Sequence, residues 1–200
     1  MKILGIMGSP RTKGNSATLL GKVLDGAISK SAETNIISLN NLDIKGCINC
    51  DACKRSGKCV LKDDMQKIYD MIDDSDIIVF SSPNYMGGIH GKLKCVIDRL
   101  YAYIISEEGG FSVTFNKKKK AALIVTQRTP EEYTSYTEAF TPLRYILNNI
   151  FEGSFDDPCK LLLGGELNGP NDAGSNIELM NKAYNMGIDL VEDFKTIDVL

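Results

Sequence analysis

Four of the six cysteines lie within one short segment, and cysteines this close together suggest a metal or redox site. Cys47, Cys50, Cys53 and Cys59 form the pattern C-x2-C-x2-C-x5-C. Two-residue spacers allow one loop to supply three thiolates to a [4Fe–4S] cluster, in which each thiolate bonds a different iron, and the fourth ligand can follow slightly later. Four thiolates would also satisfy a tetrahedral zinc ion, and reduced thiols without any metal are a third hypothesis.

The other reactive side chains suggest packing rather than chemistry. Cys95 and Cys159 fall in a predicted helix and at the start of a predicted strand, where we interpret them as small buried side chains. His90 is the single histidine and has no evident acid partner, so a surface or capping role is the simpler interpretation. We therefore predict no catalytic acid, base or nucleophile.

A turn at residues 8–16, with the sequence GSPRTKGNS, is rich in hydroxyls, amides and glycine. It lies between a predicted strand and a predicted helix, whose N-terminus would offer unpaired N–H groups and the positive end of its dipole. Arg11 or Lys13 would add positive charge, so the turn suits a phosphate group. It has neither a Walker A nor a Gly-x-Gly-x-x-Gly spacing, and an ordinary capped turn is the alternative.

A second candidate loop follows a buried strand at residues 82–88, with the sequence SPNYMGG. The ring of Tyr85 could stack on a flat heteroaromatic ligand while the exposed backbone bonds to the polar edge of that ligand. Tyr85 could equally be a half-buried packing residue.

Buried apolar runs alternate with amphipathic helices along the chain. The runs predict strands at residues 2–7, 34–39, 76–82, 121–126 and 160–163, and the helices fall near 15–28, 63–72, 93–104, 136–150 and 176–194. This alternation predicts one α/β domain over residues 1–200, with a doubly wound five-stranded parallel sheet in the flavodoxin-like order 2-1-3-4-5 and helices on both faces. A ligand would lie beyond the carboxyl ends of the first, third and fourth strands. The cysteine-rich loop, residues 46–62, is inserted after the second strand at the same edge, so we expect it near that ligand.

The composition excludes some classes of partner. With a formal net charge of −3 and a pI near 5.3, the chain does not suit general binding to nucleic acid or to an anionic membrane. No apolar run approaches the roughly 20 residues needed to span a bilayer, and Met1 and Lys2 lead directly into a strand-like segment rather than a signal-peptide core. We expect a cytoplasmic, reducing location, where a disulfide framework is disfavoured.

The two loops, followed by Lys94-x-x-x-Asp98-Arg99, resemble the motifs of the NAD(P)H-dependent FMN reductases and multimeric flavodoxin-like proteins. With the cysteine segment and the Asp63-Asp64-Met65 that follows it, the chain more narrowly resembles the iron–sulfur flavoproteins of archaea and bacteria. The resemblance is strong over about the first hundred residues and elsewhere covers only the order of strands and helices.

This resemblance implies FMN and a [4Fe–4S] cluster as cofactors, with the four clustered cysteines as the cluster ligands. The FMN phosphate would be held by Ser9, Arg11, Asn15 and Ser16, with Lys13 beside them. The ribityl chain and isoalloxazine would be lined by Pro83, Asn84, Tyr85, Met86 and Gly87, with Ser82 at the start of the loop. Met86 departs from the pattern of many relatives, which place a tryptophan or another aromatic residue there.

The resemblance also implies a function and partners. The leading hypothesis is electron transfer between a cluster and FMN, from a ferredoxin-like donor to a small acceptor such as an oxygen species or a quinone. The alternatives are an NAD(P)H-dependent FMN or quinone reductase without a cluster, and a flavodoxin-fold binding module with a zinc-stabilised loop. We also expect a homodimer or homotetramer, with contacts in the long loops at residues 101–116 and 127–133.

Overall fold

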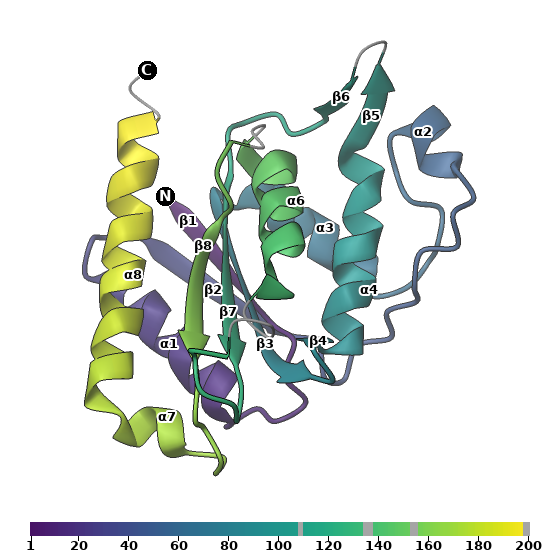
Figure 1. Ribbon diagram of the computed structural model, residues 1–200. Coiled ribbons are helices and arrows are strands. Elements are labelled where there is room, and N and C mark those ends of the chain that lie inside the picture. The colour runs from purple at the N-terminus through teal and green to yellow at the C-terminus, as the bar shows by residue number, and fades with distance from the viewer. Residues whose placement is uncertain (108–109, 134–137, 153–155, 198–200) are drawn as a thin grey trace.

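The central feature of the protein is a parallel sheet in the order β2-β1-β3-β7-β8 (Figure 1). The computed structural model describes residues 1–107, 110–133, 138–152 and 156–197. The strands of the sheet are β1 (Lys2–Met7), β2 (Glu33–Ser38), β3 (Ile77–Tyr85), β7 (Lys120–Thr126) and β8 (Lys160–Gly164). The predicted strand order is therefore confirmed, with every pair of neighbours on this path parallel.

Helices cover both faces of the sheet, as Figure 1 shows. One face carries α1 (Asn15–Ile28), the short α7 (Asp172–Ser175) and α8 (Ile177–Ile197). The other carries α3 (Met65–Asp74), α4 (Gly91–Arg99) and α6 (Thr141–Glu152). A separate apolar core fills each layer, and the central strands β1, β3 and β7 contribute to both cores because their side chains alternate between the faces.

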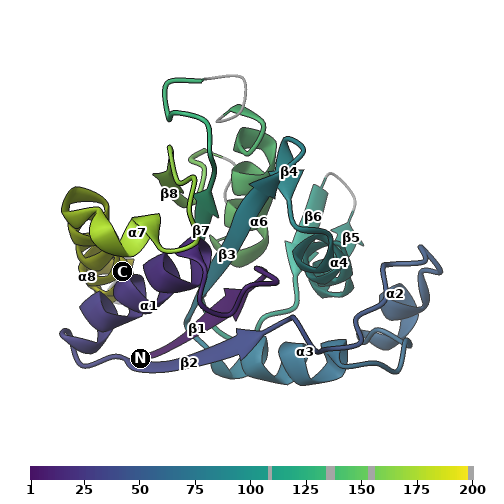
Figure 2. The same cartoon turned by 90° about the horizontal axis from the view of Figure 1, so that it is seen from below.

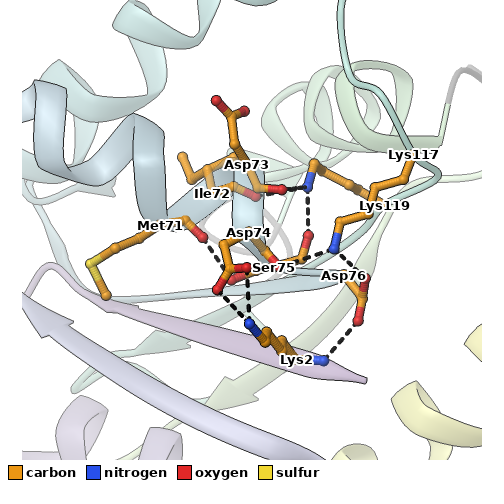
Figure 3. Close-up of polar contacts among 9 residues, drawn as sticks. All are labelled: Lys2, Met71, Ile72, Asp73, Asp74, Ser75, Asp76, Lys117 and Lys119. Atoms are coloured by element: carbon orange, nitrogen blue, oxygen red, sulfur yellow. Dashed lines mark hydrogen bonds and ion pairs between the residues drawn. The ribbon is translucent and has the colours of Figure 1, made fainter.

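A polar cluster at the amino edge of the sheet fixes the end of α3 to the starts of the strands (Figure 3). The buried ammonium of Lys119 donates hydrogen bonds to the carbonyl oxygens of Ile72 and Asp73, at 2.7 and 2.9 Å, where α3 ends. The carboxylate of Asp76 accepts from the backbone N–H of Lys2 at 2.7 Å and from the ammonium of Lys117 at 2.6 Å. A cation at a helix C-terminus satisfies carbonyls that have no partner within the helix.

Two segments differ from the predicted elements on the α4 side. The helix predicted to continue to residue 104 ends at Arg99, and a 3₁₀ turn (Leu100–Tyr103) leads into β5 (Ile104–Glu107), which pairs antiparallel with β6 (Gly110–Val113). The ammonium of Lys54 donates to the carbonyl oxygens of Tyr101 and Ile104, at 2.6 and 2.5 Å, and so links the cysteine loop to this 3₁₀ turn.

The remaining differences concern the ends of elements. β3 runs three residues beyond its predicted end at residue 82 and folds back into β4 (Gly88–Ile89), so the second candidate loop is a β-hairpin. Of the predicted helix at 136–150, α6 begins at Thr141, and residues 136–137 lie outside the described part of the chain. In the ranges that the structure describes, no helix combines the length and apolarity needed to cross a membrane.

Candidate functional site

A pocket of about 270 Å³ opens at the carboxyl edge of the sheet, the edge seen from below in Figure 2. Four segments line it, each at or just beyond the carboxyl end of one strand of the sheet. They contribute Ser9, Arg11 and Gly14 to Ser16 after β1, Pro83 to Tyr85 at the end of β3, Thr126 at the end of β7 with Gln127 and Arg128 after it, and Leu167 to Pro170 after β8. The pocket thus lies where parallel α/β sheets bind their ligands.

The turn after β1 forms one wall of this pocket. The buried Ser9 hydroxyl accepts a hydrogen bond from the Arg11 backbone N–H at 3.1 Å, which curls the chain before α1 begins. Gly14 is the N-cap of α1 and has no side chain with which to cap the first turn. The start of a fourteen-residue helix therefore faces the pocket, which is a suitable environment for an anion.

Asn15 joins that wall to the segment after β8. Its side-chain amide donates to the carbonyl of Gly169 at 2.7 Å and accepts from the backbone N–H of Ala173 at 3.0 Å. The hydroxyl of Ser16 lies 2.7 Å from that of Thr126, which joins the same wall to the end of β7. Both predicted site residues line the pocket, and both also hold its walls together.

The hairpin after β3 forms the opposite wall. Asn84 pairs with Ile89, and the turn residues Met86 and Gly87 have φ values of 52° and 80°, as the tight two-residue turns of β-hairpins require. Tyr85 is 46% exposed and packs edge-on against His90, with ring centroids 5.7 Å apart. Its ring remains accessible from the pocket that it lines.

Four of the predicted FMN residues do not line the cavity. Lys13 is exposed on the turn after β1, and Met86 and Gly87 form the exposed tip of the hairpin. Ser82 is buried, and its hydroxyl accepts from the backbone N–H of His90 at 2.8 Å, so it braces the base of the hairpin.

The side chain of Asn84 has one buried polar atom without a hydrogen bond among the described residues. Its amide nitrogen donates to the side-chain oxygen of Gln127 at 3.0 Å, while its own oxygen is buried without a hydrogen bond among the described residues. An unpaired buried acceptor costs about 1–3 kcal/mol, which a ligand N–H would recover. The polar edge of a flat heteroaromatic ring such as a flavin carries such a donor, so the pocket fits FMN.

Two of the pocket walls contain residues that were not named from the sequence. Thr126 to Arg128 lie at the carboxyl end of the fourth predicted strand, where the ligand was expected, and Leu167 to Pro170 follow the fifth, where it was not. The same rule that selected the loops after the first and third strands applies to both, because all parallel strands end at one edge. Polar residues directly after a buried run were the available signal.

The four clustered cysteines line one small cavity together with Arg99 and Tyr101. Cys53 lies on the short helix α2 (Ala52–Ser56) and, like Cys59, is half-buried, whereas Cys47 and Cys50 are exposed. Within the described residues, no three His, Cys, Asp or Glu side chains converge as they would on a single metal ion. Four thiols around one cavity are nevertheless a donor set that fits a cluster, because each thiolate of a cubane bonds a different iron.

The cysteine cavity and the pocket at the sheet edge lie at opposite ends of α4. The hairpin precedes the first residue of α4, whereas Arg99 at its end lines the cysteine cavity, and the two sites share no lining residue. Both views place α2 beyond α4 and away from β4 (Figures 1 and 2). A nine-residue helix is about 13 Å long. The expectation that the cysteine loop lies beside the ligand loops is therefore wrong within one chain.

The path of the chain after β2 explains this separation. The ammonium of Lys92 on α4 donates to the carbonyl oxygens of Asn40 and Leu42, at 2.7 and 3.0 Å. The chain that leaves β2 is thereby held against α4, and the loop continues toward the C-terminal end of that helix.

A family model of NADPH-dependent FMN reductases matches residues 1–142. The chain belongs to this family. Among the curated relatives of this chain is an iron–sulfur flavoprotein of Methanocaldococcus jannaschii. It is 39% identical over 99 residues, which cover 50% of this chain and 51% of that protein. Another, from Archaeoglobus fulgidus, is 30% identical over 138 residues, or 68% of this chain and 60% of that protein. The chain spans about half the length of the curated relatives it matches.

Solved structures of FMN reductase-like proteins share the fold over nearly the whole chain. The NAD(P)H:quinone oxidoreductase of Methanothermobacter marburgensis has a TM-score of 0.73 at 18% identity, covering 95% of this chain and 98% of that one. An FMN-dependent NADH-azoreductase of Bacillus anthracis, solved in complex with FMN, has a TM-score of 0.67 at 14% identity, covering 96% and 98%. These likenesses confirm the predicted flavodoxin-like α/β fold.

Proposed function

We propose that this FMN reductase family member is an electron-transfer flavoprotein that binds FMN at the sheet edge and a [4Fe–4S] cluster in the cysteine loop. The observation that carries the proposal is that four cysteines line one cavity in a chain whose sheet edge forms a separate pocket beside the start of α1. When bound, a cluster exchanges single electrons while FMN accepts one or two, so the pair can couple single-electron delivery to two-electron chemistry. The proposed donor is ferredoxin-like, and the proposed acceptor is a small molecule such as an oxygen species or a quinone.

Each part of the pocket has a proposed role toward FMN. The turn with Ser9 and Arg11 and the start of α1 would hold the phosphate, supported by the uncapped helix start and the adjacent guanidinium. Asn84 and Tyr85 would contact the isoalloxazine, supported by the unpaired oxygen of Asn84 and the exposed ring of Tyr85. The cysteines and Arg99 would surround the cluster.

A second candidate function is NAD(P)H-dependent reduction of FMN or quinones without a cluster. The family description and the name of the M. marburgensis structure favour it, as does the lack of a converged metal site among the described residues. A flavodoxin-fold module with a zinc-stabilised loop is a third candidate, since four thiols can also bind zinc.

Metal and sulfide analysis of protein purified without oxygen separates these candidates. We expect FMN with iron and acid-labile sulfide in the wild type and in Cys159→Ala, whose thiol is buried far along the chain at the start of β8. Cys53→Ala should lose iron and sulfide while FMN remains bound. Zinc in place of iron would favour the binding module, and FMN with no metal would favour the reductase.

The choice of electron donor provides a second test of the same proposal. Reduced ferredoxin should reduce the bound flavin faster than NADPH does. The opposite order of rates would favour the reductase without a cluster.

We also propose assembly into a homodimer or homotetramer. Exposed large apolar side chains in both predicted contact loops support it, namely Ile105, Phe111 and Tyr133. An apolar groove between α4 and α6 adds to this surface and includes Cys47, Tyr101 and Ile146. Contact between two copies across this groove would place the cysteine site of each copy near its partner. Light scattering should give a mass of at least two chains, and Ile146→Glu should lower it.

A further inference from the structure

Arg99 stands out as a buried charge placed between the cysteine loop and the core. It is the last residue of α4, only 1% of its side chain is exposed, and its guanidinium lines the cysteine cavity. Two of its nitrogens bind the carboxylate of Asp63, at 2.8 and 3.2 Å, and the Asp63 side chain is fully buried. The first candidate role for such a pair is structural, since bidentate buried pairs are geometrically specific.

The pair closes the cysteine loop at its base. Arg99 donates to the carbonyl oxygen of Lys45 at 3.0 Å, and the backbone N–H of Lys45 donates to the Asp63 carboxylate at 2.9 Å. Two residues before Lys45, the backbone N–H of Asp43 donates to the carboxylate of Asp64, the residue after Asp63, at 2.7 Å. The chain therefore enters and leaves the cysteine segment at one point, where Arg99 joins the entering and leaving segments to the end of α4.

One of the three guanidinium nitrogens of Arg99 makes no hydrogen bond to the described residues. This nitrogen is the buried Nε. A buried ion pair is tolerated when its remaining N–H groups are satisfied, and an unsatisfied donor on a charged group costs more than one on a neutral group. The cavity that Arg99 lines also contains the four clustered cysteines, together with Asn49, Asp51 and Tyr101. A cluster bound by the four thiolates would bring sulfur atoms into this cavity, and sulfur can accept such an N–H.

We propose that Arg99 is a positioning residue of the cysteine site, which closes the loop through Asp63 and Lys45 and donates its Nε–H to a sulfur of the bound cluster. The inference rests on the proposed cluster. A fixed cation and a hydrogen bond to sulfur favour the reduced form, because reduction adds negative charge to a group already surrounded by thiolates. Arg99 should therefore raise the reduction potential of the cluster.

Two variants separate closure of the loop from tuning of the cluster. Arg99→Met removes both the charge and the hydrogen bonds, whereas Arg99→Lys retains the charge but cannot bind Asp63 through two nitrogens or donate from Nε. Arg55→Gln is the matched control, since it removes one exposed positive charge from the same loop. FMN content reports whether each variant folds.

The potential of the cluster, measured by an anaerobic redox titration followed by electron paramagnetic resonance, is the readout that a purely structural role would not move. We expect a lower potential in Arg99→Lys than in the wild type and no shift in Arg55→Gln. Loss of the cluster from Arg99→Lys with FMN retained would equally support the positioning role. A wild-type potential in Arg99→Lys would overturn the proposal.

Hydrogen exchange of the metal-free protein tests closure of the loop independently of the cluster. Amides in residues 46–62 should exchange about tenfold faster in Arg99→Lys or Arg99→Met than in the wild type, as loss of one charged hydrogen bond implies. Unchanged exchange would overturn the closing role. Iron-free wild-type protein would instead contradict the proposed function, so the two failures are distinguishable.

Discussion

Single buried charges hold the C-terminal ends of two helices. Arg99 closes the cysteine loop at the end of α4, and Lys119, at the amino edge of the sheet, binds carbonyls at the end of α3. In each case the charged side chain donates several hydrogen bonds to oxygens of the protein, so its removal takes a donor from more than one polar group.

Replacing Lys119 with methionine should destabilise the fold. The carbonyl oxygens of Ile72, Asp73 and Ser75 would each lose the hydrogen bond from the ammonium, at a cost of about 1–3 kcal/mol, although Ile72 would keep the one from the Ser75 backbone N–H. Burial lowers the pKa of Lys119 to about 8, so the ammonium already bears a desolvation cost that offsets part of this loss. We expect urea unfolding to show a loss of about 1–2 kcal/mol. Lys67→Met, at an exposed position on α3, should change the free energy of unfolding little. An equal loss of stability in both variants would contradict this role of Lys119.

Asp76 should contribute a pH-dependent part of the stability. Burial opposes its ionisation, but hydrogen bonds from Lys117 and from the Lys2 backbone outweigh burial and hold the pKa of this carboxyl below its ordinary 3.8. A carboxyl group whose pKa is lower in the folded state stabilises the fold at pH values above its ordinary pKa. This stabilisation is lost as the pH falls through the folded-state pKa. Asp76→Asn should therefore be less stable than the wild type at about pH 6, and the difference should shrink toward about pH 3.

Unfolding midpoints across this pH range provide the measurement, with the exposed Asp70→Asn as the control. Asp70 is an exposed residue of α3, so this variant controls for the loss of one negative charge from the same region. A constant difference for Asp76→Asn would show that the carboxylate charge contributes nothing.

Residue identity predicted the two pocket walls at the carboxyl ends of β1 and β3, but not which residue of each segment lines the pocket. Ser9, Arg11 and Tyr85 line the pocket because they follow strands whose buried apolar runs were evident. Met86 was assigned to the flavin, yet its positive φ places it at the tip of a hairpin. A two-residue turn of this type normally carries Asn or Gly at that position, so methionine gave no turn signal.

Elements that bury an apolar face were predictable, and those that do not were missed. The five strands and five long helices follow from hydrophobic periodicity, because their packing faces are apolar. The pair β5 and β6 lies outside the main sheet, and Ile104 continues the helical spacing of α4 even though the chain has become a strand. The pairing of β5 with β6 and the contacts of Lys54 from another loop stabilise the observed turn, and the local sequence does not contain them.

The packing of α1 on α8 gives a prediction at this scale. A Cβ atom on Gly26 would lie 2.0 Å from the carbonyl oxygen of Tyr184, and one on Gly187 would lie 1.9 Å from that of Val23. Gly26→Ala should push the helices apart and lower the free energy of unfolding by about 1–3 kcal/mol. Gly21→Ala, on α1 with nothing within 4 Å of the added atom, should raise it by about 0.5–1 kcal/mol. Thermal unfolding that ranks the two variants otherwise would contradict this close contact.

At the scale of the molecule, α4 connects two sites. The hairpin of the FMN pocket precedes this helix, and the cysteine cavity lies at its end. Strand order predicted the edge at which the FMN pocket lies, because every parallel strand ends there. Strand order could not predict the course of the cysteine loop, because that loop has no helical or strand periodicity. The hydrogen bonds of Lys92 and Arg99 determine its course.

Electron flow from the cysteine site to FMN is tested most directly by stopped-flow reduction of the oxidised protein with reduced ferredoxin, with flavin absorbance as the readout. We expect rapid flavin reduction in the wild type and in Cys159→Ala. In Cys53→Ala the flavin should remain bound but be reduced much more slowly, because the proposed cluster would be missing. Equal rates of flavin reduction in all three proteins would contradict a role of the cysteine loop in electron transfer.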